Sequence, residues 1–178
     1  MDSINQQQPE RNHEDLQGNA AGEKIKELVE KADSCFFCTQ VRNSQAFSTR
    51  PMAVQQVDDN GDCWFLSAAD SHKNAQIAQD PQVQLLFQAS KHSGFVTLYG
   101  TAEISRDKQK IGELWHGIFK TWFTEGENDP RITVIRFRPT EGYYWDTKHG
   151  MVVAFAKQVA GALTGQTLDD SVEGKLLP

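Results

Sequence analysis

Hydrophobic residues recur at helical spacing in several parts of the chain. In residues 22–32 the apolar positions are separated by Glu and Lys, which predicts a short amphipathic helix. In residues 107–123 they recur at i, i+3, i+4 and i+7, which predicts a second and longer helix. Residues 71–79 also fit a helix, because the Asp-Pro pair that follows cannot continue one. Residues 152–163 are a further candidate helix.

The segments between these helices are typical of β-strands. An Asp-Asn-Gly turn at residues 59–61 joins two of them, and Asn-Gly favours a tight hairpin because it tolerates positive φ. Strands in mainly hairpin order, with helices inserted at fixed points, predict a mainly β fold: a small barrel with peripheral helices. The six expected strands are 34–41, 46–57, 63–69, 83–89, 94–104 and 131–146, the last continuing past a proline.

The two ends of the chain differ in composition from its middle. Residues 1–20 are polar and have few sizeable apolar side chains, so we expect a disordered tail. Residues 166–178 are expected to form a loose C-terminal tail, which leaves residues 21–165 as one domain. Residues 1–20 also lack the basic and then apolar order of a secretory signal.

Charge and cysteine content narrow the choice of partners and compartment. The 178 residues include 24 acidic and 18 basic side chains, and a net charge of −6 argues against binding nucleic acid or an anionic membrane. No apolar run approaches the roughly 18 residues needed to cross a bilayer. Three cysteines, an odd number without a signal, favour reduced thiols. We therefore expect a soluble, cytoplasmic protein.

Most familiar catalytic patterns are missing from the sequence. Cys35 and Cys38 have the spacing of redox and zinc sites, but in a strand residues three apart point to opposite faces. Cys63 stands alone in another strand, so buried structural cysteines are expected. The five histidines show no metal-ligand spacing, and no G-x-S-x-G pattern occurs. No metal site and no general acid or base is assigned.

The start of the helix at residues 71–79 is unusual in its charge. His72 and Lys73 place basic groups at the positive end of the helix dipole, where they favour stability only if an anion lies between them. A helix N-terminus with Ser71 and a lysine is suited to phosphate. If the hairpin folds back, Arg50 reaches the same place, beside Ser67, and adds a bidentate phosphate ligand. A solvated lysine and a surface ion pair for the arginine remain the alternatives.

An ordered series of short motifs resembles the flavin-binding split barrels related to pyridoxamine 5′-phosphate oxidase, and within them the bacterial general stress protein branch. The resemblance covers roughly residues 22–165. The matching segments are Ser48-Thr49-Arg50-Pro51-Met52, Trp64-Phe65-Leu66-Ser67, Ser71-His72-Lys73, Asp80-Pro81-Gln82-Val83, Tyr99-Gly100-Thr101-Ala102, Leu114-Trp115, Trp122-Phe123, Gly126, Asp129-Pro130, Tyr144-Trp145-Asp146 and Ala162-Leu163-Thr164-Gly165.

The resemblance implies a six-stranded antiparallel split barrel and a homodimer that holds FMN, or alternatively FAD, at the subunit interface. In such proteins residues matching Arg50, Ser67 and Lys73 hold the phosphate, and the strand that follows Arg50 runs along the isoalloxazine ring. The partner subunit contributes aromatic side chains, which we place at Trp122, Phe123 and Trp145. The full expected cofactor site is Arg50, Pro51, Met52, Ala53, Val54, Gln55, Leu66, Ser67, Ser71, His72, Lys73, Trp122, Phe123 and Trp145.

Two departures from the true oxidases bear on function. They carry an Arg-x-His-x-Arg stretch for the vitamin phosphate, whereas this chain reads Asp-Thr-Lys-His-Gly after Trp145, and Phe95 stands where they place a flavin-contacting Gln. The resemblance therefore implies an FMN-binding general stress protein, a flavin-dependent oxidoreductase with an unidentified small-molecule substrate. The alternatives are a flavin-binding module without turnover, and a flavin-free barrel that binds haem or a deazaflavin.

Overall fold

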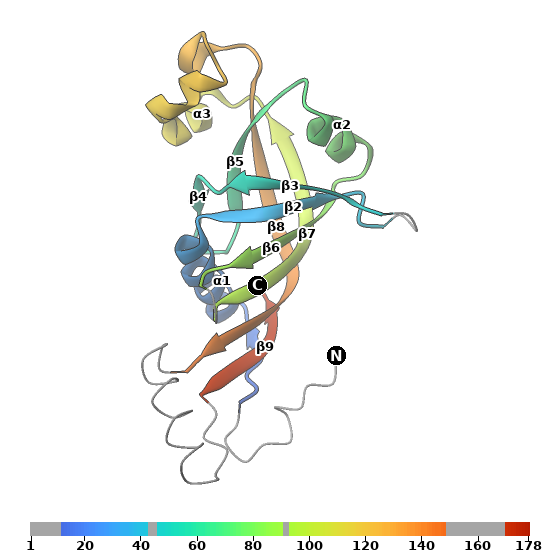
Figure 1. Ribbon diagram of the computed structural model, residues 1–178, viewed down its shortest axis with the longest axis vertical. Coiled ribbons are helices and arrows are strands. Elements are labelled where there is room, and N and C mark those ends of the chain that lie inside the picture. The colour runs from blue at the N-terminus through green and yellow to red at the C-terminus, as the bar shows by residue number, and fades with distance from the viewer. Residues whose placement is uncertain (1–11, 43–45, 91–92, 149–169) are drawn as a thin grey trace.

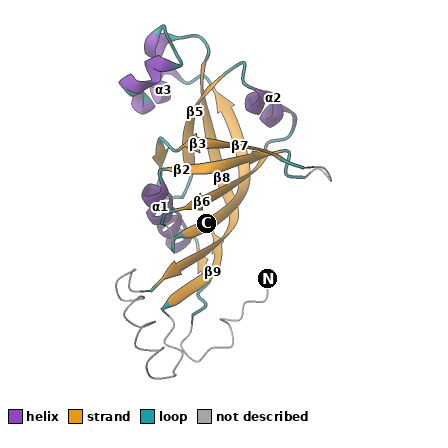
Figure 2. Ribbon diagram, in the orientation of Figure 1, coloured by secondary structure: helices purple, strands orange, loops and turns teal. Residues whose placement is uncertain are grey.

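The computed structural model describes residues 12–42, 46–90, 93–148 and 170–178, and its main feature is one curled, nine-stranded sheet (Figures 1 and 2). The strands follow the order β1-β9-β8-β7-β6-β2-β3, with β5 pairing a free part of β8 and β4 pairing β5. Among the described residues β3 and β5 are not paired, so the barrel stays open between them. The expected mainly β split barrel with peripheral helices is confirmed.

The number of strands is larger than expected, nine instead of six, and β1 and β9 run parallel to each other. The strands are β1 (Leu16–Gln17), β2 (Ser34–Thr39), β3 (Ser48–Ala53), β4 (Gln56–Val57), β5 (Cys63–Ala68), β6 (Gln82–Gln88), β7 (Phe95–Ser105), β8 (Ile132–Thr147) and β9 (Ser171–Leu177). The helices are α1 (Asn19–Ala32), α2 (His72–Gln79) and α3 (Lys108–Leu114), with short 3-10 helices η2 (Gly117–Thr121) and η3 (Gly126–Asn128).

Strand β8 organises the sheet. It pairs with β7 along nearly its whole length, while its other edge pairs first with β5 and then with β9. The β7–β8 register shifts at Gly100, where a Cβ atom would overlap the carbonyl oxygen of Arg138. Only glycine, which lacks a Cβ atom, allows the two strands to approach this closely where the register shifts.

Two apolar clusters occupy the two faces of the curled sheet. Inside the barrel, Phe37 and Phe65 pack edge to face with ring centroids 5.3 Å apart, and Leu28 of α1 is buried in the same cluster. The second cluster lies under α3, where Ile111 and Leu114 are buried. Strand β5 serves both clusters because successive side chains of a strand point to opposite faces.

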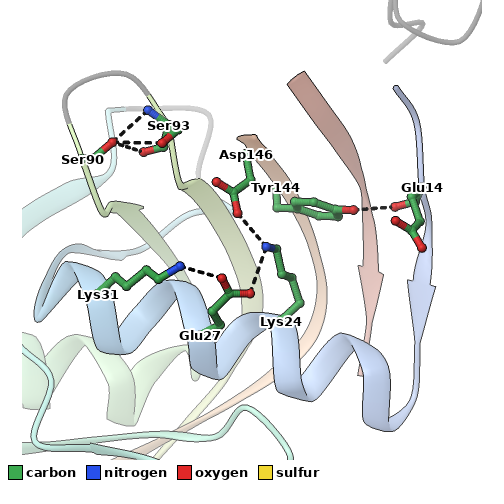
Figure 3. A network of polar contacts seen from close by, with 8 residues as sticks. All are labelled: Glu14, Lys24, Glu27, Lys31, Ser90, Ser93, Tyr144 and Asp146. Atoms are coloured by element: carbon green, nitrogen blue, oxygen red, sulfur yellow. Dashed lines mark hydrogen bonds and ion pairs between the residues drawn. The ribbon is translucent and has the colours of Figure 1, made fainter. Parts of the chain in front are cut away.

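Ion pairs fix α1 across the second half of β8 (Figure 3). Lys24 Nζ lies 2.6 Å from a carboxylate oxygen of Asp146 and 3.0 Å from one of Glu27. Burial opposes the charge of Lys24, but these hydrogen bonds outweigh it and raise its pKa. Next to them, the Tyr144 hydroxyl donates to the backbone oxygen of Glu14, 2.9 Å away. The helix, the N-terminal segment and the sheet are thus joined at one place.

The expected loose tail at residues 166–178 is wrong for its last part, because Ser171–Leu177 form strand β9. Its Val172 and Leu176 side chains are buried, and the strand covers an edge of β8 that would otherwise leave backbone groups unpaired. The disordered tail expected over residues 1–20 is also wrong for residues 12–17, which lie against β9, because β1 pairs with that strand in register. Residues 1–11 and 149–169 lie outside the described part of the chain.

The long helix expected over residues 107–123 is also wrong, because α3 ends at Leu114. Glycine at position 117 costs about 1 kcal/mol in a helix interior, and here the chain continues as the 3-10 helix η2. The apolar spacing still serves one core, since the Trp115 ring lies 5.7 Å from that of Phe119 and 6.4 Å from that of Phe123. The helix expected at residues 152–163 falls outside the described residues.

Candidate functional site

Arg50 on β3 is held beneath helix α2. Its Nη1 donates to Thr39 Oγ1 at 2.7 Å, and its Nη2 donates to Gln76 Oε1 at 2.9 Å. The expected proximity to α2 is found, but the expected route to it is wrong. The Asn-Gly turn pairs only β4 with β5, as in Gln56 opposite Trp64, and β3 pairs with β2 instead.

Three hydroxyl and ammonium groups meet at the start of α2. Ser71 is the N-cap, and its Oγ accepts from the backbone N of Asn74 at 3.4 Å. The Lys73 Nζ donates to Ser71 Oγ at 3.4 Å, and the Ser67 hydroxyl at the end of β5 lies 3.3 Å from the same oxygen. The structure therefore brings together Ser67, Ser71 and Lys73, as the sequence predicts.

Asn74 forms a buried layer under these groups. Its Oδ1 accepts from Ser67 Oγ at 2.7 Å and from Ser71 Oγ at 3.1 Å, while its Nδ2 donates to Thr133 Oγ1 at 2.9 Å. Asn74 is not among the site residues predicted from the sequence, although its position carries a signal. Asn74 precedes the buried Ile77 by three positions, so a polar side chain lies on the core-facing side of the helix and must find partners there.

Gln76 plays the same part for Arg50, and was also missed. Its carbonyl accepts from the guanidinium, and its Nε2 donates to Gln40 Oε1 at 3.2 Å and to Ser48 Oγ at 3.1 Å. Gln40 follows β2 with a positive φ of 61°, a conformation that costs energy outside glycine. These contacts fix the orientation of the Arg50 guanidinium.

The electrostatics of this group favour an anion. Burial lowers the pKa of Arg50, and burial together with the charge of Arg50 lowers the pKa of Lys73. Both cations are thus destabilised relative to water, and neither forms an ion pair with a carboxylate in the described part of the chain. A phosphate accepts hydrogen bonds from both and removes their mutual repulsion, so the residues fit such a group.

The remaining residues of the strand after Arg50 differ in direction. Met52 and Val54 pack against the barrel core, so only their main chain is available to a ligand. Pro51 and Ala53 are exposed, and Gln55 Nε2 donates to the Ala53 backbone oxygen at 3.0 Å. Two other expected site residues do not join the cluster of Ser67, Ser71 and Lys73. Leu66 packs in the apolar cluster under α3, and the His72 side chain is exposed.

The three aromatic residues expected from the partner subunit lie in different surroundings. Trp122 is 62% exposed and Phe123 is 6% exposed, in line with the expectation that they do not share a core. Trp145 packs on Tyr143, with ring centroids 4.7 Å apart. It lies twelve residues along β8 from Thr133, roughly 40 Å at the usual strand rise. Within one chain, Trp145 is therefore remote from the phosphate-binding group.

The cysteines are buried free thiols, and burial raises the pKa of Cys35 and Cys63, which keeps both protonated and unreactive. No set of three or more His, Cys, Asp or Glu side chains in the described ranges is placed to hold a metal ion. No helix in those ranges combines the length and apolar character that crossing a membrane requires.

Comparison with known proteins gives a consistent family. A family model described as pyridoxamine 5′-phosphate oxidase like matches residues 20–169. Protein bli-3 of Neurospora crassa is 25% identical over 127 residues, which cover 66% of this chain and 61% of that relative. A general stress protein 26 from Jannaschia sp. CCS1 superposes with a TM-score of 0.73 at 24% identity, covering 88% of this chain and 97% of that one. A general stress FMN/FAD binding protein from Xanthomonas citri gives 0.59 at 21% identity, covering 74% and 91%.

Proposed function

The chain belongs to the pyridoxamine 5′-phosphate oxidase-like family, and from that premise we propose that it binds a flavin, FMN, as a protein of the general stress type. The observation that carries this proposal is that Lys73 meets the hydroxyls of Ser67 and Ser71 at the start of α2, beneath which Arg50 is held. Neither cation forms an ion pair with a carboxylate among the described residues. The flavin phosphate supplies the missing anion. The Xanthomonas citri protein with a similar fold, described as FMN/FAD binding, supports the same choice of ligand.

In this proposal the residues divide into two roles. Arg50, Lys73, Ser67 and Ser71 hold the phosphate, with the first turn of α2 beside it. The main chain of β3, from Arg50 to Ala53, lies at the end of the described strand order, where it would be available to the isoalloxazine ring of a bound flavin. A bound flavin supplies hydride or electron transfer, while the protein orients the ring and sets its surroundings.

A homodimer and a cytoplasmic location are part of the proposal. Large apolar side chains stay exposed on the single chain, notably Trp122 at 62% and Phe36 at 58%, and a second copy would cover them. The three free thiols fit a reducing compartment. The substrate is a small molecule other than pyridoxamine phosphate, because the arginine pair of the true oxidases is missing after Trp145.

The test is a titration of the apo protein with FMN and with riboflavin, which differs from FMN only by the phosphate. We expect Arg50→Ala with Lys73→Ala to weaken FMN binding by about 100-fold or more, since each charge-assisted hydrogen bond contributes about 1.5–3 kcal/mol. Riboflavin affinity should stay within about twofold, because the ring contacts remain. The matched control, Lys26→Ala with Lys31→Ala on α1, removes the same charge far from the site.

Each outcome separates the candidate functions. Equal loss in the double variant and the control would reject the phosphate assignment. A purified protein that shows a Soret band or binds only a deazaflavin would reject FMN. Bound FMN that neither NADH nor NADPH reduces at a useful rate would favour the flavin-binding module without turnover.

A further inference from the structure

The N-terminal strap, residues 12–17, lies along the edge of β9 that faces away from β8 (Figure 1). The Glu14 backbone N–H donates to the Glu173 oxygen at 2.8 Å, and the Glu173 N–H donates to the Asn12 oxygen at 3.0 Å. His13 stands directly opposite Glu173 in a parallel bridge. Directly paired residues of neighbouring strands project to the same face of a sheet, so the side chains of His13 and Glu173 are neighbours.

Two buried atoms at this bridge lack a hydrogen-bond partner among the residues that the structure describes, His13 Nδ1 and Glu173 Oε1. Glu173 is only 5% exposed, so solvent does little to compensate for the missing partner. The other nitrogen of the imidazole, Nε2, lies 3.0 Å from Asp15 Oδ1 and therefore carries the proton of the neutral ring. Nδ1 is then an acceptor, as Glu173 Oε1 is, and two acceptors cannot bond to each other.

The face of the sheet that carries His13 is acidic. Burial raises the pKa of Tyr143 on β8, and the charges of Glu173 and Asp15 raise it further, so both carboxylates lie near its hydroxyl. Neither carboxylate forms an ion pair with a lysine or arginine in the described ranges. Lys175 of β9 lies on the same face, but its side chain is exposed, and its backbone N–H is the group that donates to Asp15 Oδ1, at 2.7 Å.

The other charged groups near the strap have other contacts. Lys148 at the end of β8 donates to Asn12 Oδ1. Glu14 follows His13 in an extended segment and so points to the opposite face, where it lines a hollow together with Lys24 of α1. His13 is therefore placed to supply the positive charge that the acidic face needs.

We propose that a proton taken up by His13 from solvent locks the strap onto β9. The imidazolium donates from Nε2 to Asp15 and, after a rotation of the side chains, from Nδ1 to Glu173, so each of the two unpaired atoms gains a partner. When the proton leaves, two acceptors face each other again and the strap opens more often. An imidazole changes its charge between about pH 5 and 8, so the strap should be held firmly in mild acid and loosely above neutrality. The proton lock does not depend on the proposed flavin site at α2 and β3.

The experiment is amide hydrogen exchange on the full-length protein between about pH 5.5 and 8, the range in which an imidazole titrates. Each rate is divided by the intrinsic rate at that pH to give a protection factor. The amides of Glu14 and Glu173 report on the strap, since both form its backbone hydrogen bonds to β9. Their protection factors should be at least about tenfold higher at the acidic end of the range, the size expected from one charge-assisted hydrogen bond. Amides of α2 are the internal reference and should keep constant protection factors.

Two substitutions replace the proton by a permanent donor. In Glu173→Gln the side-chain amide donates to the bare Nδ1, and in His13→Gln it donates to Glu173 Oε1, at every pH. Both variants should therefore keep the protection of acidic wild type across the whole range, within about twofold. His116→Gln, which removes an exposed histidine on another part of the chain, is the matched control and should keep the pH dependence of wild type.

Equal protection of the strap amides at both ends of the range in wild type would overturn the proton lock. So would a pH dependence that survives in either variant. A variant with unprotected strap amides and normal α2 amides would do the same, because the amide donor would then not replace the proton. If one variant loses protection in α2 as well, it does not fold, and the other variant decides.

Discussion

Replacing Asn74 by leucine tests the buried hydrogen bonds that support the proposed phosphate-binding residues. The side chain is 5% exposed, and leucine has a similar size, so the change removes hydrogen bonds without opening a large cavity. Three bonds are lost, to Ser67, Ser71 and Thr133. The hydroxyls of all three keep other contacts, for example Thr133 Oγ1 to the Ser67 backbone oxygen at 2.9 Å. The loss in free energy of unfolding should therefore be close to the net contribution of the three hydrogen bonds.

Each hydrogen bond contributes about 1 kcal/mol net, so the free energy of unfolding of the variant should be about 3 kcal/mol lower than that of wild type. For a chain of this size each kcal/mol corresponds to about 2–4 °C, so the melting temperature should fall by about 6–12 °C. Ser67 and Ser71 also lose the amide that orients them, so the FMN affinity should fall while riboflavin affinity does not.

The assay is urea denaturation followed by tryptophan fluorescence, with Gln79→Leu as the control on an exposed position of the same helix. The control should change the unfolding free energy by less than about 0.5 kcal/mol. A loss below that value in Asn74→Leu itself, or equal effects on FMN and riboflavin, would refute the idea that this amide organises the site.

Three further predictions follow from individual contacts. The pKa of Lys73 is lowered in the folded protein, so just below pH 10.5 the unfolded chain binds more protons than the folded chain. The free energy of unfolding of wild type, compared with that of Lys73→Met, should therefore rise as the pH increases toward 10.5. Urea titrations at several pH values measure this difference. Phe123→Ala should lower the free energy of unfolding by about 3–5 kcal/mol, as judged by thermal unfolding. Gly174→Ala should force a Cβ atom against the Glu14 carbonyl oxygen and speed amide hydrogen exchange in residues 12–17 without affecting α2.

Local patterns in the sequence predicted the elements that depend on local physics. The helical spacing of residues 22–32 corresponds to α1, and the Asn-Gly turn at residues 59–61 joins β4 to β5. The mainly β barrel was predicted from strands in mainly hairpin order with helices inserted at fixed points. The seven residues of β9 gave no such signal, because they acquire a defined partner only when β8 presents an edge to them.

Pairing between distant segments also decided which parts of the site could be predicted. Arg50, Ser71 and Lys73 were identifiable because a phosphate requires their chemistry. The route that brings Arg50 to α2 depends on β2, a partner that no local pattern indicates. Asn74 and Gln76 were missed because their role lies in contacts to Thr133, Gln40 and Ser48, which the fold alone brings near.

The position of β9 has a consequence for the behaviour of shortened chains. This strand occupies the edge of β8 from Gly142 to Thr147, and residues 12–17 in turn lie against β9. A chain that ends before Ser171 would leave a bare edge of six residues, with hydrogen-bonding groups free to recruit the same edge of another molecule. Truncation at the C-terminus should therefore cause aggregation through strand pairing, even though every residue of the phosphate site remains in place.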